Sequence, residues 1–255
     1  MKPFQSARAF TLIELLVVIS IIGILAAILL PALARAKTTA KIQQAKLEIT
    51  QIANAIQGYD LAYGKYPVST NVMAAEAVSG NDFTYGADTL IAKGLALPSA
   101  YNAYHPDNSE IMSVLLDVET YPMTGLPTIN VGHLKNPGRS ALLAAKFTSE
   151  TNTPGVGSDL VYRDPWGTPY IITLDLNYDD KAQDVFYQNQ VVSQMTPGQA
   201  LGYNGLVNSK DPGGNGNHYQ HNGPVMVWSL GPDKMAGFIP ANQGVNKDNI
   251  LSWKQ

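Results

Sequence analysis

The sequence predicts an α+β protein with one long N-terminal α-helix followed by a head that contains a small antiparallel β-sheet. Two observations lead to this fold class. An apolar segment at residues 10–33 is followed by residues 42–59, in which apolar side chains recur at helical spacing. Beyond residue 163, apolar side chains instead occupy every second position of Tyr170–Leu176, as expected of a strand.

The composition excludes several classes of function. Charged residues make up 15% of the 255 residues, well below the roughly 25% of typical soluble domains. The net charge of -3 gives no basic surface of the kind that nucleic-acid-binding domains carry, so we expect no nucleic-acid partner. The chain has no cysteine, which excludes disulfides, cysteine nucleophiles and thiolate metal sites.

The apolar segment from Phe10 to Leu33 is long enough to span a membrane. Its roughly 24 residues extend about 36 Å as a helix, against a hydrocarbon core of about 30 Å. Glu14 is its only charged residue, and a carboxylate inside a membrane costs on the order of 2.5 kcal/mol. An ordinary signal peptide, cleaved at the small-x-small pattern of Ala32–Ala34, would have a shorter apolar run. A plain signal anchor explains the length but not the acid.

The stretch "AFTLIELLVVISIIGILAAILLPALARAK", which begins at Ala9, resembles the N-terminus of type IV pilins and type II secretion pseudopilins. The family pattern is a short basic leader, a small residue, an aromatic residue or Met, then T-L-I-E-L and an apolar stretch that ends in proline. The resemblance implies a leader at residues 1–9, cleavage between Ala9 and Phe10 by a prepilin peptidase, and N-methylation of Phe10. The family usually has glycine where this chain has Ala9.

The resemblance also gives Glu14 and Pro31 roles in assembly. In a helical filament, the Glu14 carboxylate of one subunit would pair with the free α-amine of a neighbour's Phe10, and this pairing removes the cost of an isolated buried charge. Pro31 removes one backbone hydrogen bond from the helix. It is either a tolerated kink in a membrane helix or, as in the family, one end of a segment from Gly23 that melts in the filament.

The charges that flank the apolar segment do not decide its orientation. Lys2 and Arg8 favour a cytoplasmic N-terminus. Four basic residues that follow the segment argue for the opposite orientation: Arg35, Lys37, Lys41 and Lys46. The family resemblance implies that the N-terminus is cytoplasmic and the head periplasmic.

The helix is predicted to continue past the membrane-spanning segment of residues 10–34. Residues 35–66 form an amphipathic continuation that should pack on the head, and Gly58 and the Tyr63–Pro67 stretch end it near Tyr59. Its apolar stripe is formed by residues at three- and four-residue steps: Ile42, Ala45, Ile49, Ile52, Ala53, Ile56 and Tyr59.

The rest of the chain divides into a region of weak signal and a β-rich region. Residues 67–160 predict short helices, loops and one or two strands, and we interpret them as a variable insertion of the head that decorates a filament or meets a partner. Residues 161–255 predict the β-sheet head. In it, residues 183–187 would pair with the strand Tyr170–Leu176, and residues 224–229 would add a further strand.

Three blocks in this region resemble the G-type, or major, pseudopilin of type II secretion: "RDPWGTPY" from Arg163, "WSLGPDK" from Trp228 and "NKDNILSW" from Asn246. In that family the loop after the second block binds Ca²⁺, which takes six to eight oxygen ligands. Here the resemblance implies a calcium site with the side chains of Asp233, Asn246, Asp248 and Asn249 and the backbone carbonyls of Leu230 and Met235. Alternatively, these Asp and Asn residues only shape turns.

Other polar clusters do not predict chemistry. His218 and His221 lack a companion acid at ligand spacing, so a solvated loop is the better interpretation. The acidic residues of the 175–184 segment are typical of a solvated turn, although they would also allow a catalytic carboxylate pair. The sequence holds no phosphate-binding glycine loop, nucleophile elbow or helical metal motif.

We therefore expect a structural subunit rather than an enzyme. The resemblance implies a pseudopilin that is anchored in the bacterial inner membrane and assembles into the periplasmic filament of a type II secretion system. Its implied partners are identical and related pseudopilins, the prepilin peptidase/methyltransferase and the inner-membrane secretion platform. A type IV pilus subunit for adhesion or DNA uptake is the first alternative, and a membrane-anchored periplasmic enzyme is the second.

Overall fold

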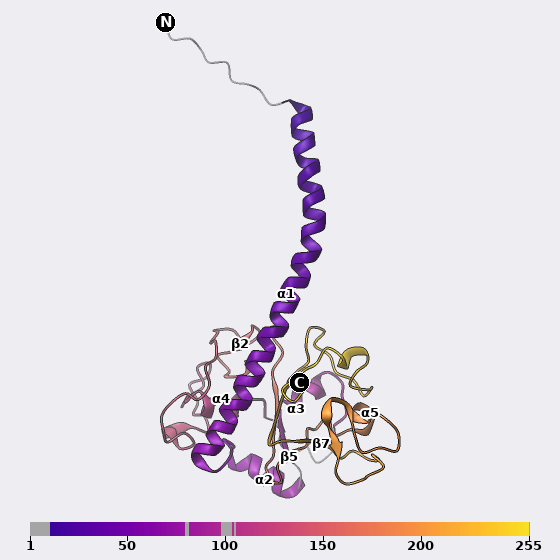
Figure 1. Ribbon diagram of the computed structural model, residues 1–255. Coiled ribbons are helices and arrows are strands. Elements are labelled where there is room, and N and C mark those ends of the chain that lie inside the picture. The colour runs from indigo at the N-terminus through magenta and orange to yellow at the C-terminus, as the bar shows by residue number, and fades with distance from the viewer. Residues whose placement is uncertain (1–10, 80–81, 98–103, 105, 255) are drawn as a thin grey trace. The chain divides into compact units, whose positions relative to one another are not determined.

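The computed structural model describes residues 11–79, 82–97, 104 and 106–254. The chain forms two compact units, residues 1–41 and residues 42–255. The helix α1 (Leu12–Tyr63) contributes its first part to the first unit and its second part to the second unit (Figure 1). The fold class is the predicted one, a long N-terminal helix with antiparallel sheets.

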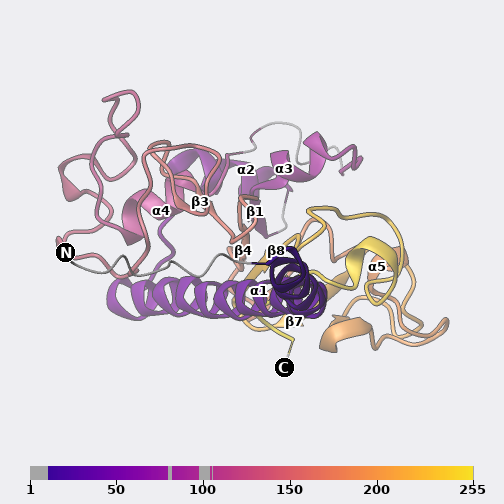
Figure 2. The same ribbon diagram turned by 90° about the horizontal axis from the view of Figure 1, so that it is seen from above.

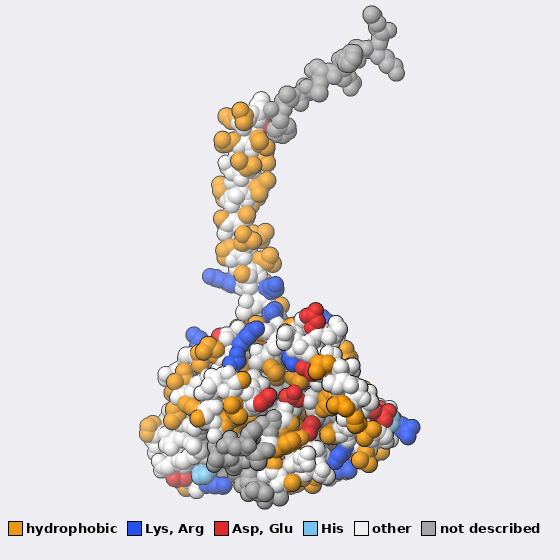
Figure 3. Space-filling model, turned by 180° about the vertical axis from the view of Figure 1, so that it is seen from behind, with side chains coloured by type: hydrophobic (Ala, Val, Ile, Leu, Met, Phe, Trp, Pro, Cys, Tyr) orange, Lys and Arg blue, Asp and Glu red, His pale blue; other side chains and the backbone are white. Residues whose placement is uncertain are grey.

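The described part of the first unit is helical from Leu12 and is apolar up to Leu33 except for Thr11, Glu14 and Ser20. One 18-residue window of α1 has a mean hydropathy of 3.0, and none of it is buried, so the helix is long and apolar enough to cross a membrane. Figure 3 shows apolar side chains along the visible face of this part of the helix, and the large apolar side chains from Leu12 to Leu33 are exposed. A helix that is apolar on every face needs lipid or other protein around it. Pro31 lies inside α1, which remains helical from Gly23 onwards in this single chain.

In the second unit α1 is amphipathic, as predicted. Its buried side chains lie on one face and belong to the larger of two hydrophobic clusters: Ala45, Ile49, Ile52, Ala55, Ile56 and Tyr59. The helix ends four residues later than expected. Gly58 does not interrupt it, and Gly64 terminates it with a φ of 64° and an N–H that donates to the carbonyl of Asp60.

The central sheet has four antiparallel strands in the order β1-β4-β8-β9. One face packs in the cluster that contains α1, and the other face packs in the second cluster, so β4 is buried at every position. Figure 2 shows α1 alongside β4 and β8. The strands are β1 (Phe83–Tyr85), β4 (Ile171–Leu174), β8 (Val225–Ser229) and β9 (Ile250–Leu251).

The prediction that residues 183–187 form a strand paired with Tyr170–Leu176 is wrong. The strand β4 pairs with β1 and β8, and residues 185–188 form a turn. The cause is local, because the buried carboxylate of Asp184 accepts hydrogen bonds from the backbone N–H groups of Phe186 and Tyr187, both at 2.9 Å. Such side-chain bonds offer the backbone an alternative to a strand ladder.

The strand β1 comes from the region that the sequence left poorly defined. It lies within residues 67–160, yet it completes one edge of the central sheet by pairing Thr84 with Thr173 of β4. The two threonine hydroxyls lie 2.9 Å apart. This region is therefore part of the core fold at this point rather than only a surface addition.

Short elements surround this core. The strands β2 and β3 form a two-stranded sheet, and β5, β7 and β6 form a three-stranded sheet in that order. Their bounds are Gly155–Val156 for β2, Tyr162–Arg163 for β3, Lys181–Ala182 for β5, Val207–Asn208 for β6 and Tyr219–Asn222 for β7. The helices are α2 (Thr70–Ser79), α3 (Ala87–Ala92), α4 (Ser109–Leu115) and α5 (Gln190–Ser193), with 3₁₀ turns at Val131–His133, Tyr203–Gly205 and Gly244–Asn246.

The stability of the head should depend on the buried stripe of α1. Ile52 is fully buried, so Ile52→Ala should lower the free energy of unfolding by about 2–5 kcal/mol through lost contacts and a residual cavity. Leu61 on the same helix is 88% exposed, and Leu61→Ala should change it by less than about 0.5 kcal/mol. Urea unfolding of the full chain in a nonionic detergent, followed by tryptophan fluorescence, measures both values. Equal losses would contradict the assignment of the buried face.

Candidate functional site

The residues expected to be processed and to assemble lie at the start of α1. Ala9 and Phe10 are outside the described residues. Glu14 is exposed in the first turn, where its Oε2 accepts hydrogen bonds from Thr11 N at 2.8 Å and Thr11 Oγ1 at 2.7 Å. In return, Glu14 N donates to Thr11 Oγ1 at 3.3 Å. This reciprocal pair is a capping box, which satisfies N–H groups that a helix start leaves free.

The T-L-I-E motif therefore has a local role that the sequence analysis missed. The signal was available, since Thr followed three residues later by Glu before an apolar run is the capping-box pattern. Both hydrogen bonds from Thr11 go to Oε2. Among the described residues no donor reaches Oε1, which leaves this oxygen available to a cation from outside the chain.

A second candidate site is formed where the three C-terminal blocks meet. Asp164, which is fully buried, accepts hydrogen bonds at Oδ1 from the backbone N–H groups of Trp166 and Thr168, both at 2.9 Å. Its Oδ2 accepts the hydroxyl of Ser229 at 2.5 Å. Ser229 Oγ in turn accepts the N–H of Gly231 at 3.0 Å. One carboxylate thus joins the turn of the first block to the end of β8 in the second block.

Gly231 then brings the second block against the third. It has a φ of 71°, a left-handed conformation that favours glycine. A Cβ at this position would lie 2.2 Å from the backbone oxygen of Asp248. The S-L-G sequence therefore needs its glycine for two reasons, the backbone conformation and the close passage of the third block.

The structure brings together only part of the predicted calcium ligands. The N–H of Asp233 donates to Asp248 Oδ2 at 3.4 Å, and Asp233 Oδ1 accepts the N–H of Met235 at 2.9 Å. Asp248 Oδ1 and Asn249 Oδ1 are buried and accept no hydrogen bond from the protein. Burial, followed by the charge of Asp233, raises the pKa of Asp248. Buried oxygens without donors beside a second carboxylate are what a cation would satisfy.

Other predicted ligands have different neighbours. Asn246 holds the loop closed, because its Oδ1 accepts the N–H of Gly237 at 3.0 Å and its Nδ2 donates to the carbonyls of Gly237 and Ile239 at 2.7 Å. The side chain of Leu230 is buried in the second hydrophobic cluster and that of Met235 is exposed, and the prediction for their backbone carbonyls stays a prediction. Within the described part of the chain, no three His, Cys, Asp or Glu side chains gather to hold a metal. Of the predicted side-chain ligands, Asp248 and Asn249 carry buried oxygens without a donor, and Asp233 lies next to Asp248.

The other polar residues considered in the sequence, Asp175, Asp184 and His221, lie within the folded head, and the two aspartates form hydrogen bonds that hold its turns and strands. The Asp175 carboxylate accepts the N–H groups of Asp179 and Asp180 at 3.2 and 2.7 Å, and so closes the turn between β4 and β5. The Asp184 carboxylate also accepts Thr173 Oγ1 at 2.7 Å and Trp228 Nε1 at 3.0 Å. Burial lowers the pKa of His221, which favours a neutral ring.

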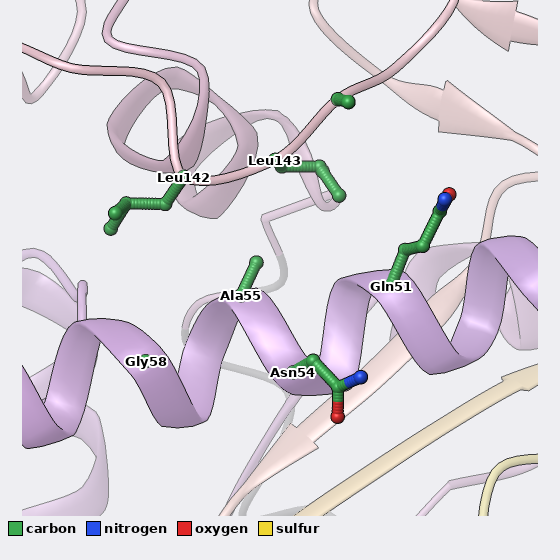
Figure 4. A pocket seen from close by; sticks show the side chains of 7 residues that line it. Gln51, Asn54, Ala55, Gly58, Leu142 and Leu143 are labelled. Atoms are coloured by element: carbon green, nitrogen blue, oxygen red, sulfur yellow. The ribbon is translucent and has the colours of Figure 1, made fainter.

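A groove of about 360 Å³ runs beside the second half of α1. Figure 4 shows the segment that carries Leu142 and Leu143 opposite Ala55 and Gly58 of the helix, with the amide side chains of Gln51 and Asn54 at its rim. Ala144 completes the lining. The groove contains no acid, base or nucleophile, so it offers packing surface rather than catalytic groups.

Comparisons with known proteins point to one superfamily. Residues 5–30 match the family model described as a prokaryotic N-terminal methylation motif. The type II secretion system core protein G of Klebsiella michiganensis is 28% identical over 156 residues, which cover 61% of this chain and 92% of that protein. The chain is therefore similar to type IV pilins and pseudopilins at its N-terminus and, at lower identity, to a G-type pseudopilin over most of that protein's length. No solved structure matches this chain significantly.

Two further relatives match over shorter stretches. The type II secretion system core protein G of Escherichia coli K12 is 39% identical over 69 residues, which are 27% of this chain and 48% of that protein. The type IV major pilin protein PilE1 of Neisseria gonorrhoeae is 40% identical over 75 residues, 29% of this chain and 45% of that protein. For these two relatives the chain spans about half of their length. The Klebsiella michiganensis protein, in contrast, is matched over most of its length.

The contact between the second and third blocks can be tested with two glycines that share a left-handed φ. At Gly94, φ is 85° and a Cβ would meet no atom within 4 Å, so Gly94→Ala should cost about 1–2 kcal/mol of unfolding free energy. At Gly231 a Cβ would also displace the backbone of Asp248. Gly231→Ala should therefore lower the free energy of unfolding by about 1–3 kcal/mol more than Gly94→Ala does. Urea unfolding of both variants gives the difference. Equal losses would show that the blocks do not depend on this close approach.

Proposed function

We propose that this chain is a pseudopilin, a structural subunit of the periplasmic filament of a type II secretion system. The observation that carries the proposal is the exposed apolar half of α1, most of which lies within the matched N-terminal methylation motif of residues 5–30. The coverage of a core protein G over 92% of its length supports the secretion system over other users of this helix. In this role the chain transmits force by assembly and performs no catalysis.

The apolar half of α1 gives this role a physical basis. In the membrane, lipid surrounds its side chains, and in a filament the same side chains would pack against those of neighbouring subunits. Lipid tails are as apolar as leucine, so this transfer gains little hydrophobic free energy and depends on packing and polar pairing. We infer that subunits enter the filament from the inner-membrane secretion platform, driven by a separate cytoplasmic ATPase.

Processing would prepare the polar pair. In the proposed pathway the N-terminus is cytoplasmic, the peptidase/methyltransferase cleaves between Ala9 and Phe10, and Phe10 acquires a methylated cationic amine. The amine of one subunit would then meet Glu14 of the next. The capping box supports this geometry, because it occupies Oε2 and leaves Oε1 without a donor in the described chain. Pro31 would be the site of any local change in the helix on assembly.

Two substitutions separate the capping role of Glu14 from its charge. Glu14→Gln can keep the capping box, since glutamine serves at this position, but it removes the charge. Glu14→Ala removes both. Loss of one partner of a buried ion pair costs about 3–5 kcal/mol, so both variants should remain in the membrane and fail to enter filaments.

The measurement is the amount of each variant in sheared filaments relative to membranes, by immunoblot in the native host. Thr11→Val serves as the matched control, because it weakens the cap and keeps the Glu14 charge. Normal filaments from Glu14→Gln would contradict the ion pair and leave only a capping role.

We further propose that Asp233, Asp248 and Asn249 bind calcium together with the backbone carbonyls of Leu230 and Met235. Bound Ca²⁺ would neutralise two carboxylates and hold the loop of residues 230–249 closed in a chain without disulfides. Asn246 would act as a loop clip rather than a ligand. The support is the pair of buried oxygens, Asp248 Oδ1 and Asn249 Oδ1, that lack donors within the protein.

Calcium should therefore raise the thermal stability of the head. A ligand present at 100 times its Kd adds about 2.7 kcal/mol to the folded state. In a head of this size that corresponds to an increase in Tm of about 5–10 °C. Thermal unfolding in 10 mM CaCl₂ and in EGTA should show this difference for the unmodified chain and lose it in Asp248→Asn. Asp211→Asn, which changes a carboxylate elsewhere, is the control. A Tm that does not respond to Ca²⁺ would contradict the site.

A type IV pilus subunit for adhesion or DNA uptake is the second candidate. It is favoured by the 40% identity to the Neisseria gonorrhoeae pilin over 75 residues. It would share the processing and the ion pair, but it would not need the junction of the three C-terminal blocks. Secretion defects in a deletion strain, rather than loss of surface pili, would decide for the secretion system.

A further inference from the structure

A pocket of about 280 Å³ lies on the head between α1 and the C-terminal strand β9. Its walls are basic and its floor is apolar. The lining residues are Ile42, Lys46, Lys247, Asp248, Asn249, Ile250, Leu251 and Lys254. None of the functions above uses its three lysines.

The three lysines give the pocket a net positive charge. Lys46 comes from α1, whereas Lys247 and Lys254 flank β9, so the fold joins residues about 200 positions apart. All three are exposed, and among the described residues none of them has a carboxylate oxygen within 4.0 Å. Asp248 is the single acidic residue of the lining, and its Oδ2 is oriented to Asp233 N. The chain as a whole is negative, with a net charge of -3, so this concentration of ammonium groups is local.

The floor adds a second recognition element. Ile250 and Leu251 are almost fully buried and Ile42 is partly buried, so they present a firm apolar base beneath the ammonium groups. Lysine is a compact point charge that binds phosphate without requiring a fixed geometry. The chemistry of the pocket therefore suits a phosphate group that is attached to an apolar body.

The covalent chain places a source of such groups within reach. Lys46 follows Leu33, the last residue of the apolar segment, by 13 residues, which span at most about 45 Å. Tethering of this kind raises the effective concentration of one partner at the other. Each lysine near an anionic lipid surface contributes about 1 kcal/mol of attraction. Phospholipid phosphates are thus favoured over soluble anions.

We propose that the pocket lined by Lys46, Lys247 and Lys254 binds the phosphate of an anionic phospholipid headgroup while the subunit is in the membrane. The proposal rests on the membrane anchoring in the proposed function, but it needs neither processing nor filaments. The docked headgroup holds the head at the bilayer surface. Its release is then one of the costs of extracting the subunit into a filament.

The test measures the reactivity of individual lysines in the full chain. The chain in a nonionic detergent is mixed with dioctanoyl-phosphatidylglycerol, dioctanoyl-phosphatidylcholine or inorganic phosphate at equal concentrations. It is then labelled briefly with an amine-reactive acetylating ester, and peptide mass spectrometry gives the rate at each lysine. Phosphatidylglycerol should slow labelling of the three pocket lysines by about fivefold, the factor that corresponds to the attraction at one lysine. Labelling of the exposed Lys93, Lys146 and Lys210 should not change.

Matched triple variants complete the test. Lys46→Gln with Lys247→Gln and Lys254→Gln should lose retention of phosphatidylglycerol in native mass spectrometry. Lys93→Gln with Lys146→Gln and Lys210→Gln removes the same number of charges and should retain it. Unchanged Tm values check that both variants fold.

Three results would overturn the proposal. Equal protection by phosphatidylcholine would show that charge is not recognised. Equal protection by inorganic phosphate would make the pocket a general anion site. Protection that rises with protein concentration in the absence of lipid would identify an acidic surface of a second copy as the occupant. Because unprocessed chain is used, none of these results depends on filament assembly.

Discussion

The continuity of α1 is the constraint on which the rest of the structure depends. One helix has to satisfy two surroundings, since it is apolar on all faces before residue 34 and apolar on one stripe after residue 42. The second part finds its partners within the chain, because Ile49, Ile52 and Ile56 pack in the main cluster. The first part finds none among the described residues. Lipid or other protein would supply them in the anchored, assembling subunit that we propose.

The head has to hold its loops without disulfides, and buried polar side chains perform this task. Asp164 and Asp184 are fully buried carboxylates, and each accepts at least three hydrogen bonds from the protein. Tyr170 extends this arrangement to α1, because its hydroxyl donates to Glu48 Oε2 at 2.6 Å. Burial is the main cause that raises the pKa of both aspartates. Such fully satisfied networks specify one arrangement of loops around a small sheet.

Periodic patterns made part of this structure predictable from the sequence. The apolar segment and the buried stripe of α1 were found because a helical repeat over many residues is a strong signal. The strand β4 was found from the alternation of apolar side chains in Tyr170–Leu176, and β8 was predicted as a further strand. The predicted strand at residues 183–187 failed, because a single Asp184 side chain outcompeted a short apolar run. The edge strand β1 was missed as a partner of β4, since nothing local in three residues indicates a neighbour about ninety positions away.

The candidate sites were likewise only partly predictable from the sequence. The sequence blocks around Asp164, Ser229 and Asp248 indicated a common family, but their direct contacts through Gly231 became visible only in three dimensions. The family resemblance implied Asn246 as a calcium ligand, and the fold shows that its amide also bonds the backbone of Gly237 and Ile239. The lysine pocket could not be predicted, because Lys46 and Lys254 come from opposite ends of the head's sequence. The chemistry of a single residue can be predicted from its type. Which distant residues meet at one site becomes known only from the fold.

The most direct test of the central claim is the intact mass of the protein purified from membranes of its native host. We expect a mass that lacks Met1 to Ala9 and carries one additional methyl group on Phe10. This result would show that the apolar half of α1 enters the prepilin pathway. An uncut N-terminus would contradict the claim and indicate a plain membrane anchor. Cleavage after Ala34 would also contradict it, because the head would then be released without Glu14 or the apolar helix.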